Sequence, residues 1–278
     1  METIDIYALK KVGMTNRQVK AMIDYQKKKG EDSLRNLLVA SGAGDAGKFY
    51  RRLKDLDRDE LEKEFNLYSS VSIEDAAFPQ SLRQLKHPPV LLFYSGDLSL
   101  LEDPILFVTG NQQASDMTVY LLEEFVGLLG RHCVIANSLA MGVERAATFL
   151  NLNQGGKSIA VLGTGLNQAS PQVNERLQSF MADHHLIISE YGPGTPARPH
   201  HFRERSQILL ALCQGILLLE GPDQSWLLNL CEGALDLGKE IYALPARVWD
   251  KSWQGNLRLL KEGAKLVTTP EEVLFDML

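Results

Sequence analysis

Short apolar runs recur along most of this chain, and longer segments in which apolar residues follow a helical spacing separate them. A short run bounded by turn residues is typical of a buried strand, and the 3.6-residue period is typical of an amphipathic helix. The predicted strands are 90–94, 105–109, 133–136, 158–162, 186–189, 216–219, 240–243 and 265–267, and the predicted helices are 115–129, 140–152, 207–213, 225–237 and 257–262. Because strands and helices alternate, we predict an α/β fold, an extended Rossmann-like domain whose parallel sheet carries helices on both faces.

The first 65 residues have a different pattern, in which helical segments follow one another without a strand-like run. The predicted helices are 15–28, 33–40 and 46–56. Thr15 and Gln18 have the spacing of a capping box, in which each side chain accepts a hydrogen bond from the backbone N–H of the other residue. We therefore predict two domains, a small all-helical domain of sterile-alpha-motif or helix-hairpin type over residues 1–65 and the Rossmann-like domain over residues 66–278.

Residues 155–194 combine two strand-like runs with glycine-rich turns. The run 158–162 ends in Gly163-Thr164-Gly165, and the run 186–189 ends in the turn 190–194. Ligands of open α/β sheets bind outside the carboxyl ends of the strands. Glycines at these ends let backbone N–H groups approach an anion closely. We therefore predict a phosphate-type site at this edge of the sheet.

Charge limits the partners that fit this chain, which has 278 residues and a formal net charge of −6. Residues 1–65 hold 14 Lys and Arg against 12 Asp and Glu, whereas residues 66–278 hold 15 against 23. A protein that reads duplex DNA usually has a basic face, and here only local patches provide one. No apolar run reaches the roughly 18 residues that span a bilayer, and the N-terminus lacks the apolar core of a signal peptide. We therefore predict a cytoplasmic protein without membrane insertion.

Motifs for catalysis and cofactors are incomplete. Gly156-Lys157-Ser158 precedes a predicted strand, whereas the lysine of a P-loop precedes a helix. Gly163 and Gly165 form half of a dinucleotide fingerprint, but Gln168 stands at its third position. Because no metal-ligand spacing and no hydrolase motif is present either, we predict no catalytic residue, metal or cofactor. Three widely spaced cysteines lie in apolar runs and are predicted to be buried and unpaired, namely Cys133, Cys213 and Cys231.

A local basic segment follows the turn 190–194. Arg198, Arg203 and Arg205 surround the aromatic Phe202. Guanidinium groups on phosphates and a ring stacked on a base are contacts that bind single-stranded nucleic acids. A solvated helix start with Phe202 in the core explains the same composition, and the residues alone leave both interpretations open.

Seven segments follow one another in a fixed order: VTGNQQAS (108–115), NSLAMGVERAA (137–147), GGKSIAVLGTGL (155–166), SEYGPG (189–194), HFRERSQILLAL (201–212), CQGILLLE (213–220) and LLKEGAKLV (259–267). Together with FPQSLRQLKHPPVLLFYSGD before them, they resemble the DNA processing protein A family, also called Smf, from Ser72 onward. The resemblance implies a non-catalytic protein of natural transformation. Such a protein binds incoming single-stranded DNA and helps to load a RecA-type recombinase, usually as a homodimer.

The resemblance also implies which residues contact DNA. They lie on the turns that follow three predicted strands, on the basic segment, and at the start of the helix 225–237. By position they are Gly110, Asn111, Gln112, Ser138, Met141, Gly142, Gly163, Thr164, Gly165, Gln172, Phe202, Arg205, Ser206, Gln207 and Ser225. Glu144 belongs to the second of these turns, and Asn174 follows the third.

Several positions differ from the family pattern. The family has Gly-Ser-Arg where this chain has Gly110-Asn111-Gln112, and of its Arg-Asn-Arg segment only Arg205 remains. Gln172 stands where relatives can carry a basic residue. Trp226 replaces a glycine whose backbone meets phosphate, so we expect it to fill or close the pocket. Since each lost phosphate contact lowers affinity, we expect weaker DNA binding, or binding displaced to the helical domain and to residues 198–205.

Two other functions fit parts of the sequence. The first is a scaffold that has kept surfaces for protein partners such as RecA while its DNA groove decayed. The second is a nucleotide-processing enzyme that resembles the lysine-decarboxylase-like phosphoribohydrolases, whose P-G-G-x-G-T-x-x-E signature would fall on residues 225–232. Only Glu232 matches that signature.

Overall fold

The structure, a computed structural model, describes residues 1–30 and 32–277. Its helical elements are α1 (Thr3–Lys11), α2 (Asn16–Lys29), α3 (Leu34–Ala40), α4 (Ala46–Lys54), α5 (Arg58–Phe65), α6 (Gln80–Arg83), η1 (Leu98–Leu101), α7 (Asp116–Leu129), α8 (Val143–Asn153), η2 (Gln172–Asn174), α9 (Glu175–His184), α10 (Pro199–Leu212), α11 (Ser225–Asp236), η3 (Lys251–Trp253), α12 (Gln254–Glu262) and α13 (Pro270–Met277). The strands are β1 (Ser69–Ser72), β2 (Leu91–Gly96), β3 (Ile105–Thr109), β4 (Val134–Asn137), β5 (Ser158–Val161), β6 (Leu186–Ser189), β7 (Gly215–Leu218), β8 (Glu240–Ala243) and β9 (Lys265–Leu266).

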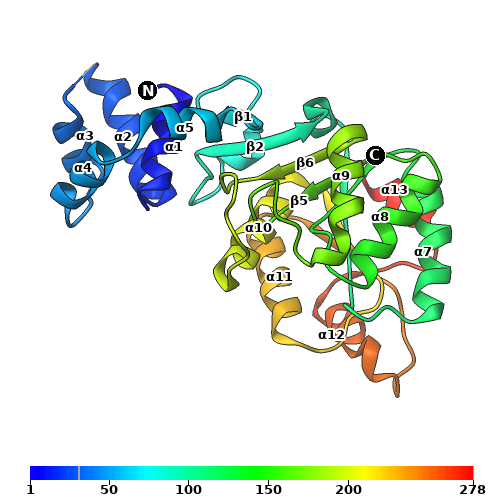
Figure 1. Ribbon diagram of the computed structural model, residues 1–278. Helices are drawn as coiled ribbons and strands as arrows, with labels where there is room; N and C mark the ends of the chain where they lie inside the picture. The colour runs from blue at the N-terminus through cyan, green and yellow to red at the C-terminus, as the bar shows by residue number, and fades with distance from the viewer. Residues whose placement is uncertain (31, 278) are drawn as a thin grey trace.

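The helical domain consists of α1 to α5 and lies at one end of the sheet, beside β1 and β2 (Figure 1). The capping box at the start of α2 is confirmed, because Thr15 N–H donates to Oε1 of Gln18 at 2.9 Å and Gln18 N–H donates to Oγ1 of Thr15 at 3.3 Å. The helices α1 and α5 were not among the predicted ones. The first is hard to recognise, since its four consecutive buried residues, Ile6 to Leu9, give no amphipathic period.

One nine-stranded sheet holds the rest of the chain together, with the strand order β1-β2-β6-β5-β4-β3-β7-β8-β9. In this spatial order, the seven neighbouring strands β6-β5-β4-β3-β7-β8-β9 are parallel to one another, which confirms the Rossmann-like prediction. The sheet is not wholly parallel, however, because β2 is antiparallel to both β1 and β6. Strand order reverses between β3 and β7, so the crevice outside their carboxyl ends is the switch point where such folds bind ligands.

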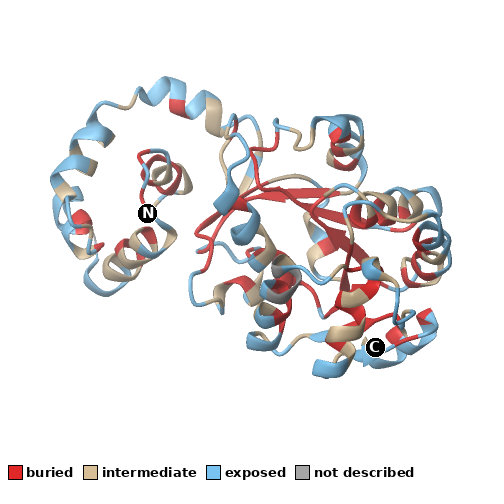
Figure 2. Ribbon diagram, turned by 90° about the horizontal axis from the view of Figure 1, so that it is seen from below, coloured by how far each residue is buried: buried red, intermediate tan, exposed pale blue. Residues whose placement is uncertain are grey.

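The core lies on both faces of the sheet, because alternate residues of each strand face opposite sides. In β3, Leu106 and Val108 pack with α7 and α13, whereas Ile105 and Phe107 pack in the cluster that includes α10 and α11. Figure 2 shows the central strands as buried elements between exposed helix faces. This two-sided burial explains why the strands read as continuous apolar runs.

An aromatic contact joins the two domains. The Tyr7 ring of α1 lies 5.2 Å from the Phe93 ring of β2 and 5.7 Å from the Phe65 ring of α5, centroid to centroid. A Cβ at Gly192 would lie 2.5 Å from Cε2 of Tyr7, so only glycine lets this turn approach the helical domain so closely. Burial of the phenol raises the pKa of Tyr7. The helical domain is therefore packed against the turn that follows β6.

The three cysteines are free and buried, as predicted. Burial raises the pKa of each thiol, Cys133, Cys213 and Cys231, to about 12. Over the described residues, no helix combines the length and apolar character needed to cross a membrane.

Candidate functional site

A small hollow lies where the carboxyl ends of β4 and β5 meet the first turns of α10. It is a shallow hollow, and its lining residues are Ser138, Leu162, Gly163, Thr164, Ser170, Ala197, Phe202 and Arg205. Five of these eight were predicted from the resemblance: Ser138, Gly163, Thr164, Phe202 and Arg205. The structure thus brings the second turn, the third turn and the basic segment together.

The first turns of α10 pack directly on the third turn at Gly163. A Cβ at this position would lie 3.4 Å from Cδ of Arg205 and 3.5 Å from Cβ of His201. Nδ1 of His201 is 2.8 Å from the carbonyl oxygen of Gly163, which can only accept, so this nitrogen carries the proton. The His201 ring also stacks on Tyr191, 3.8 Å between centroids. These contacts hold the start of α10 against the turn.

Arg205 is the charged group of the hollow. Its guanidinium carbon lies 4.8 Å from the centroid of the half-exposed Phe202 ring. Burial lowers the pKa of Arg205 and the carboxylate of Glu144 opposes this shift, but a guanidinium stays charged at neutral pH. Its Nε is buried and has no hydrogen-bond partner among the residues that the structure describes. A buried charged donor without a partner is costly, and an anion bound at the terminal N–H groups of the same guanidinium would offset that cost.

Glu144 organises the second turn from within. Its carboxylate accepts hydrogen bonds from the backbone N–H of Ser138 at 2.8 Å, from Oγ of Ser138 at 2.5 Å and from Oγ1 of Thr109 at 2.8 Å. Leu139, the next residue, adopts a φ of 56°, which is rare for a side chain of this size. Both donors of Ser138 therefore point to a carboxylate of the chain itself.

The first and second turns touch each other through their glycines. Gly142 has a φ of 78°, and a Cβ there would lie 2.1 Å from the carbonyl oxygen of Asn111. A Cβ at Gly110 would lie 2.7 Å from the carbonyl oxygen of Glu220. The backbone N–H of Val143 donates to Asn111 at 3.0 Å. These two glycines thus allow backbones to pack together at the edge of the sheet.

Glu220, which follows β7, was missed as a site residue. Its carboxylate accepts hydrogen bonds from the backbone N–H of Ser115 at 2.9 Å, from Nδ2 of Asn111 at 3.2 Å and from the Thr118 hydroxyl. Burial favours the neutral acid, but these three donors outweigh it and lower the pKa of Glu220. A carboxylate of the chain thus occupies the switch point, beside the start of α7, where other folds hold a phosphate. An acid directly after a buried strand is the signal that could have revealed it.

The other predicted residues do not line the hollow. Gln112, Met141 and Gln207 are exposed, Gln172 donates to Glu175 at 3.0 Å, and Ser206 donates to the Phe202 carbonyl at 2.8 Å. A Cβ at Gly165 would lie 2.5 Å from the Gly192 carbonyl oxygen, so this glycine serves the contact between two turns. The Ser225 side chain falls outside the described part of the chain.

The expectation that Trp226 closes the pocket is wrong. The indole N–H donates to Oε1 of Gln224 at 3.0 Å, and the ring packs half-buried against the core. It is not one of the residues around the hollow. The reason is topological, since α11 follows β7, which is separated from β4 by β3.

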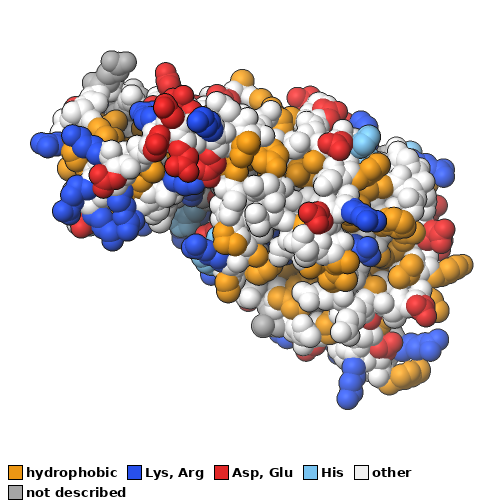
Figure 3. All heavy atoms as spheres, in the orientation of Figure 1, with side chains coloured by type: hydrophobic (Ala, Val, Ile, Leu, Met, Phe, Trp, Pro, Cys, Tyr) orange, Lys and Arg blue, Asp and Glu red, His pale blue; other side chains and the backbone are white. Residues whose placement is uncertain are grey.

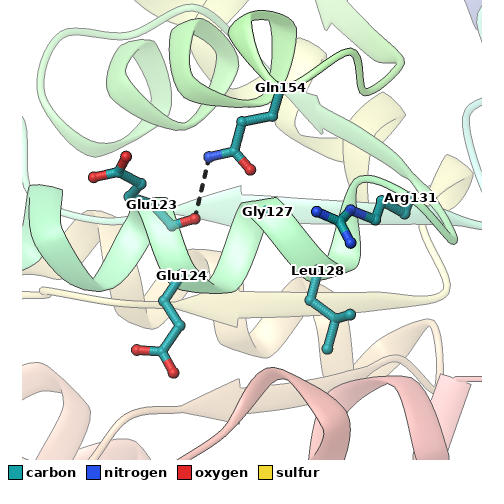
Figure 4. A pocket seen from close by; sticks show the side chains of 6 residues that line it. All are labelled: Glu123, Glu124, Gly127, Leu128, Arg131 and Gln154. Carbon is teal, nitrogen blue, oxygen red and sulfur yellow. Dashed lines mark hydrogen bonds between the residues drawn. The ribbon is translucent and has the colours of Figure 1, made fainter.

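A second surface hollow lies between α7 and the end of α8 (Figure 4). Its walls carry two carboxylates and one guanidinium, from Glu123, Glu124 and Arg131, and Nε2 of Gln154 donates to the Glu123 carbonyl at 3.3 Å. These residues lie towards the C-terminal end of α7, which leads into the amino end of β4. Ligands of this fold bind at the opposite edge, so we assign no function to this hollow.

Comparison with known proteins agrees with this architecture. The family model for the DNA recombination-mediator protein A matches residues 69–277, and that for the DNA processing protein A sterile alpha motif domain matches residues 1–61. The chain belongs to the DNA recombination-mediator protein A family. The resemblance described above is thereby confirmed. Against the DNA processing protein DprA of Streptococcus pneumoniae, another member, the identity is 38% over 275 residues, which cover 97% of this chain and 96% of that protein.

Solved structures of the family share the fold. The X-ray structure of DNA processing protein A from Streptococcus pneumoniae superposes with a TM-score of 0.95 at 36% identity, covering 100% of this chain and 99% of that chain. The protein of the same name from Helicobacter pylori, solved for its single-stranded DNA binding mode, gives a TM-score of 0.68 at 22% identity, covering 76% and 99%. At that identity the second match bears on the fold alone.

Proposed function

We propose that this chain binds single-stranded DNA at the hollow between β4, β5 and α10. The observation that carries the proposal is the buried, unpartnered Nε of Arg205 beside the half-exposed ring of Phe202. A phosphodiester group would supply the anion that this guanidinium lacks, and the ring offers a face on which a base can stack.

The wider role follows from the family. We propose that the chain works in the cytoplasm without catalysing a reaction, as a homodimer that helps to load a RecA-type recombinase onto DNA during natural transformation. The division into a helical domain over residues 1–65 and a Rossmann-like domain over residues 66–278 remains part of this proposal. Limited proteolysis tests the boundary, because cleavage between the domains should yield one fragment that ends near residue 65 and a second that begins there.

Affinity should be modest. The predicted positions Gln112 and Gln172 are neutral, and the donors of Ser138 already bind Glu144. Figure 3 shows Lys and Arg side chains gathered on the helical domain over α3 and α4, and the last turn of α4 holds Arg51, Arg52 and Lys54. This basic surface is the other place where a DNA backbone could bind.

Fluorescence anisotropy with a labelled oligo-dT tests the proposed site. Arg205→Ala should weaken binding at least about tenfold, because the variant loses a phosphate contact and the cation that packs on Phe202. Arg131→Ala removes an exposed arginine far from the hollow and should bind like the unmodified chain. If Arg205→Ala keeps full affinity while loss of Arg51 and Arg52 abolishes it, DNA binds the helical domain instead.

A scaffold function is the second candidate, because Glu220 already accepts from the Asn111 amide of the first turn and Glu144 accepts from both donors of Ser138 in the second. A pull-down distinguishes the two functions. Capture of a RecA-type recombinase by a chain that shows no oligo-dT binding at low salt would favour the scaffold. Release of free base from a nucleoside monophosphate would contradict both and indicate an enzyme.

A further inference from the structure

Arg145, in the first turn of α8, is held by a buried asparagine that also contacts the second turn. Its Nε donates a 2.8 Å hydrogen bond to Oδ1 of Asn174, a residue that is 1% exposed. Nδ2 of the same asparagine donates to the carbonyl oxygen of Leu139 at 2.6 Å. Asn174 therefore ties together α8, the second turn and the segment that follows Pro171.

These bonds connect Arg145 to two segments that contribute residues to the hollow. Leu139 directly follows Ser138, and η2, which ends at Asn174, begins two residues after Ser170. Ser138 and Ser170 both line the hollow. Through Asn174, Arg145 is thus tied to both of these segments, while Arg205 enters the hollow from α10.

The partner of Arg145 leaves its charge available. A guanidinium has five N–H groups, and here one of them serves a neutral amide. Over residues 1–30 and 32–277, Arg145 forms no ion pair with a carboxylate, and it is only half-buried. An arginine whose Nε is fixed while its terminal N–H groups stay free is preorganised to bind a phosphate.

We infer that Arg145 is a second phosphate-contacting residue of this chain, and the inference rests on the proposed function. It supplies from α8 the positive charge that Gln112 and Gln172 do not supply from their turns. The ligand is the phosphodiester backbone of single-stranded DNA, and the contact carries no base specificity. Together Arg145 and Arg205 would hold the backbone between the second turn and α10.

Salt dependence of oligo-dT binding tests the inference. Arg145→Gln should weaken binding about three- to tenfold at low salt and lower the slope of log affinity against log salt by about 0.7, the value for one phosphate contact on a single strand. Arg145→Lys keeps the charge and should restore most of that slope. Arg131→Gln should change neither quantity. The thermal unfolding midpoint of Arg145→Gln should stay within a few degrees of the unmodified chain.

The outcomes separate the inference from the proposed function. If oligo-dT binds, Arg205→Ala weakens binding and Arg145→Gln changes neither affinity nor slope, the inference is wrong and the proposed function stands. A loss of affinity without a change of slope, accompanied by a lower unfolding midpoint, shows that Arg145 only braces the turn and also overturns the inference. If the unmodified chain does not bind oligo-dT at any salt concentration, the proposed function fails first.

Discussion

Nδ2 of Asn16 in the helical domain donates a 2.9 Å hydrogen bond to Oε2 of Glu190, the residue that follows β6. Oδ1 of the same asparagine accepts a 2.6 Å hydrogen bond from Nζ of Lys10. Burial lowers the pKa of Lys10, and the carboxylates of Glu190 and Glu204 oppose this shift. Asn16 thus bridges an ammonium and a buried carboxylate across the domain interface, next to the turn that leads to the hollow.

Removal of this bridge should loosen the two domains. Asn16→Ala leaves Lys10 and Glu190 without their shared partner, which should lower the free energy of unfolding by roughly 1 to 3 kcal/mol. Urea denaturation measures the loss, and chymotrypsin, which cleaves after aromatic residues such as Tyr68, should cut the segment between α5 and β1 faster. Asn153→Ala, which removes an exposed asparagine at the end of α8, serves as the control. Equal stability of the two variants would show that the bridge contributes nothing.

The Glu220 carboxylate should occupy the position that a bound anion such as phosphate would otherwise take. Glu220→Ala leaves the Ser115 N–H, the Asn111 amide and the Thr118 hydroxyl without their acceptor, at a cost of at least about 2 kcal/mol. Inorganic phosphate should then raise the thermal midpoint of this variant more than that of the unmodified chain, because an anion can replace the carboxylate.

The exposed Glu232 of α11 gives the matched control. Glu232→Ala should leave both the stability and the response to phosphate unchanged. A phosphate response that is identical in Glu220→Ala and in the unmodified chain would argue against an anion position at the switch point, even if the stability loss is observed.

His201 should make stability depend on pH. Burial lowers the pKa of His201, and Arg198 and His200 act in the same direction while Glu204 and the Gly163 carbonyl oppose it. The pKa of His201 is about 6.5 in the unfolded chain and lower in the folded chain. At a pH between these two pKa values, only the unfolded chain holds the proton on His201. The stabilisation is therefore complete above that range and is lost as the pH falls through it.

Unfolding midpoints at neutral pH and at mildly acidic pH measure this effect. His201→Asn keeps a donor for the Gly163 carbonyl but cannot be protonated, so its stability should fall less on acidification. Residual pH dependence is expected from His185, whose pKa is also lowered by burial and by His184. The exposed His132→Gln should behave like the unmodified chain. A steeper loss in His201→Asn than in the unmodified chain is incompatible with this assignment.

Most of the sheet could be predicted because its central strands are buried on both faces and therefore read as apolar runs. The edge strand β1 was not predicted, since SSVS resembles a loop and forms a strand only by pairing with β2. The helix predicted over 207–213 begins earlier in the structure, at Pro199. The prediction missed its first turns because the polar residues before 207 hide the amphipathic period.

The candidate site was predictable only in part. The grouping of Gly163, Ser138 and Arg205 follows from parallel strand ends meeting at one edge, together with the family resemblance. The role of Glu220 depends on a contact with Ser115, which is 105 residues away along the chain. Periodicity carries no information about such a long-range side-chain bond. The structure is therefore needed to see which hydrogen-bond donors remain available to a ligand.

Two glycines at neighbouring turns should respond differently to the same substitution. Gly142 combines a φ of 78° with a Cβ position 2.1 Å from the Asn111 carbonyl oxygen, so Gly142→Ala should destabilise the chain by about 3 kcal/mol or more. At Gly163 the nearest atom is Cδ of Arg205 at 3.4 Å, the φ is not positive, and the side chain can yield. Gly163→Ala should therefore fold with little loss of stability.

The effect of Gly163→Ala should appear in binding instead. The added methyl group would lie in van der Waals contact with Cδ of Arg205 and would restrict how this side chain adjusts to a phosphate. Oligo-dT affinity should therefore fall about three- to tenfold while urea denaturation changes little. Gly44→Ala adds a methyl group where nothing lies within 4 Å and should change neither property. If Gly163→Ala unfolds as readily as Gly142→Ala, the third turn is as tightly packed as the second, and Arg205 has no room to adjust to a phosphate.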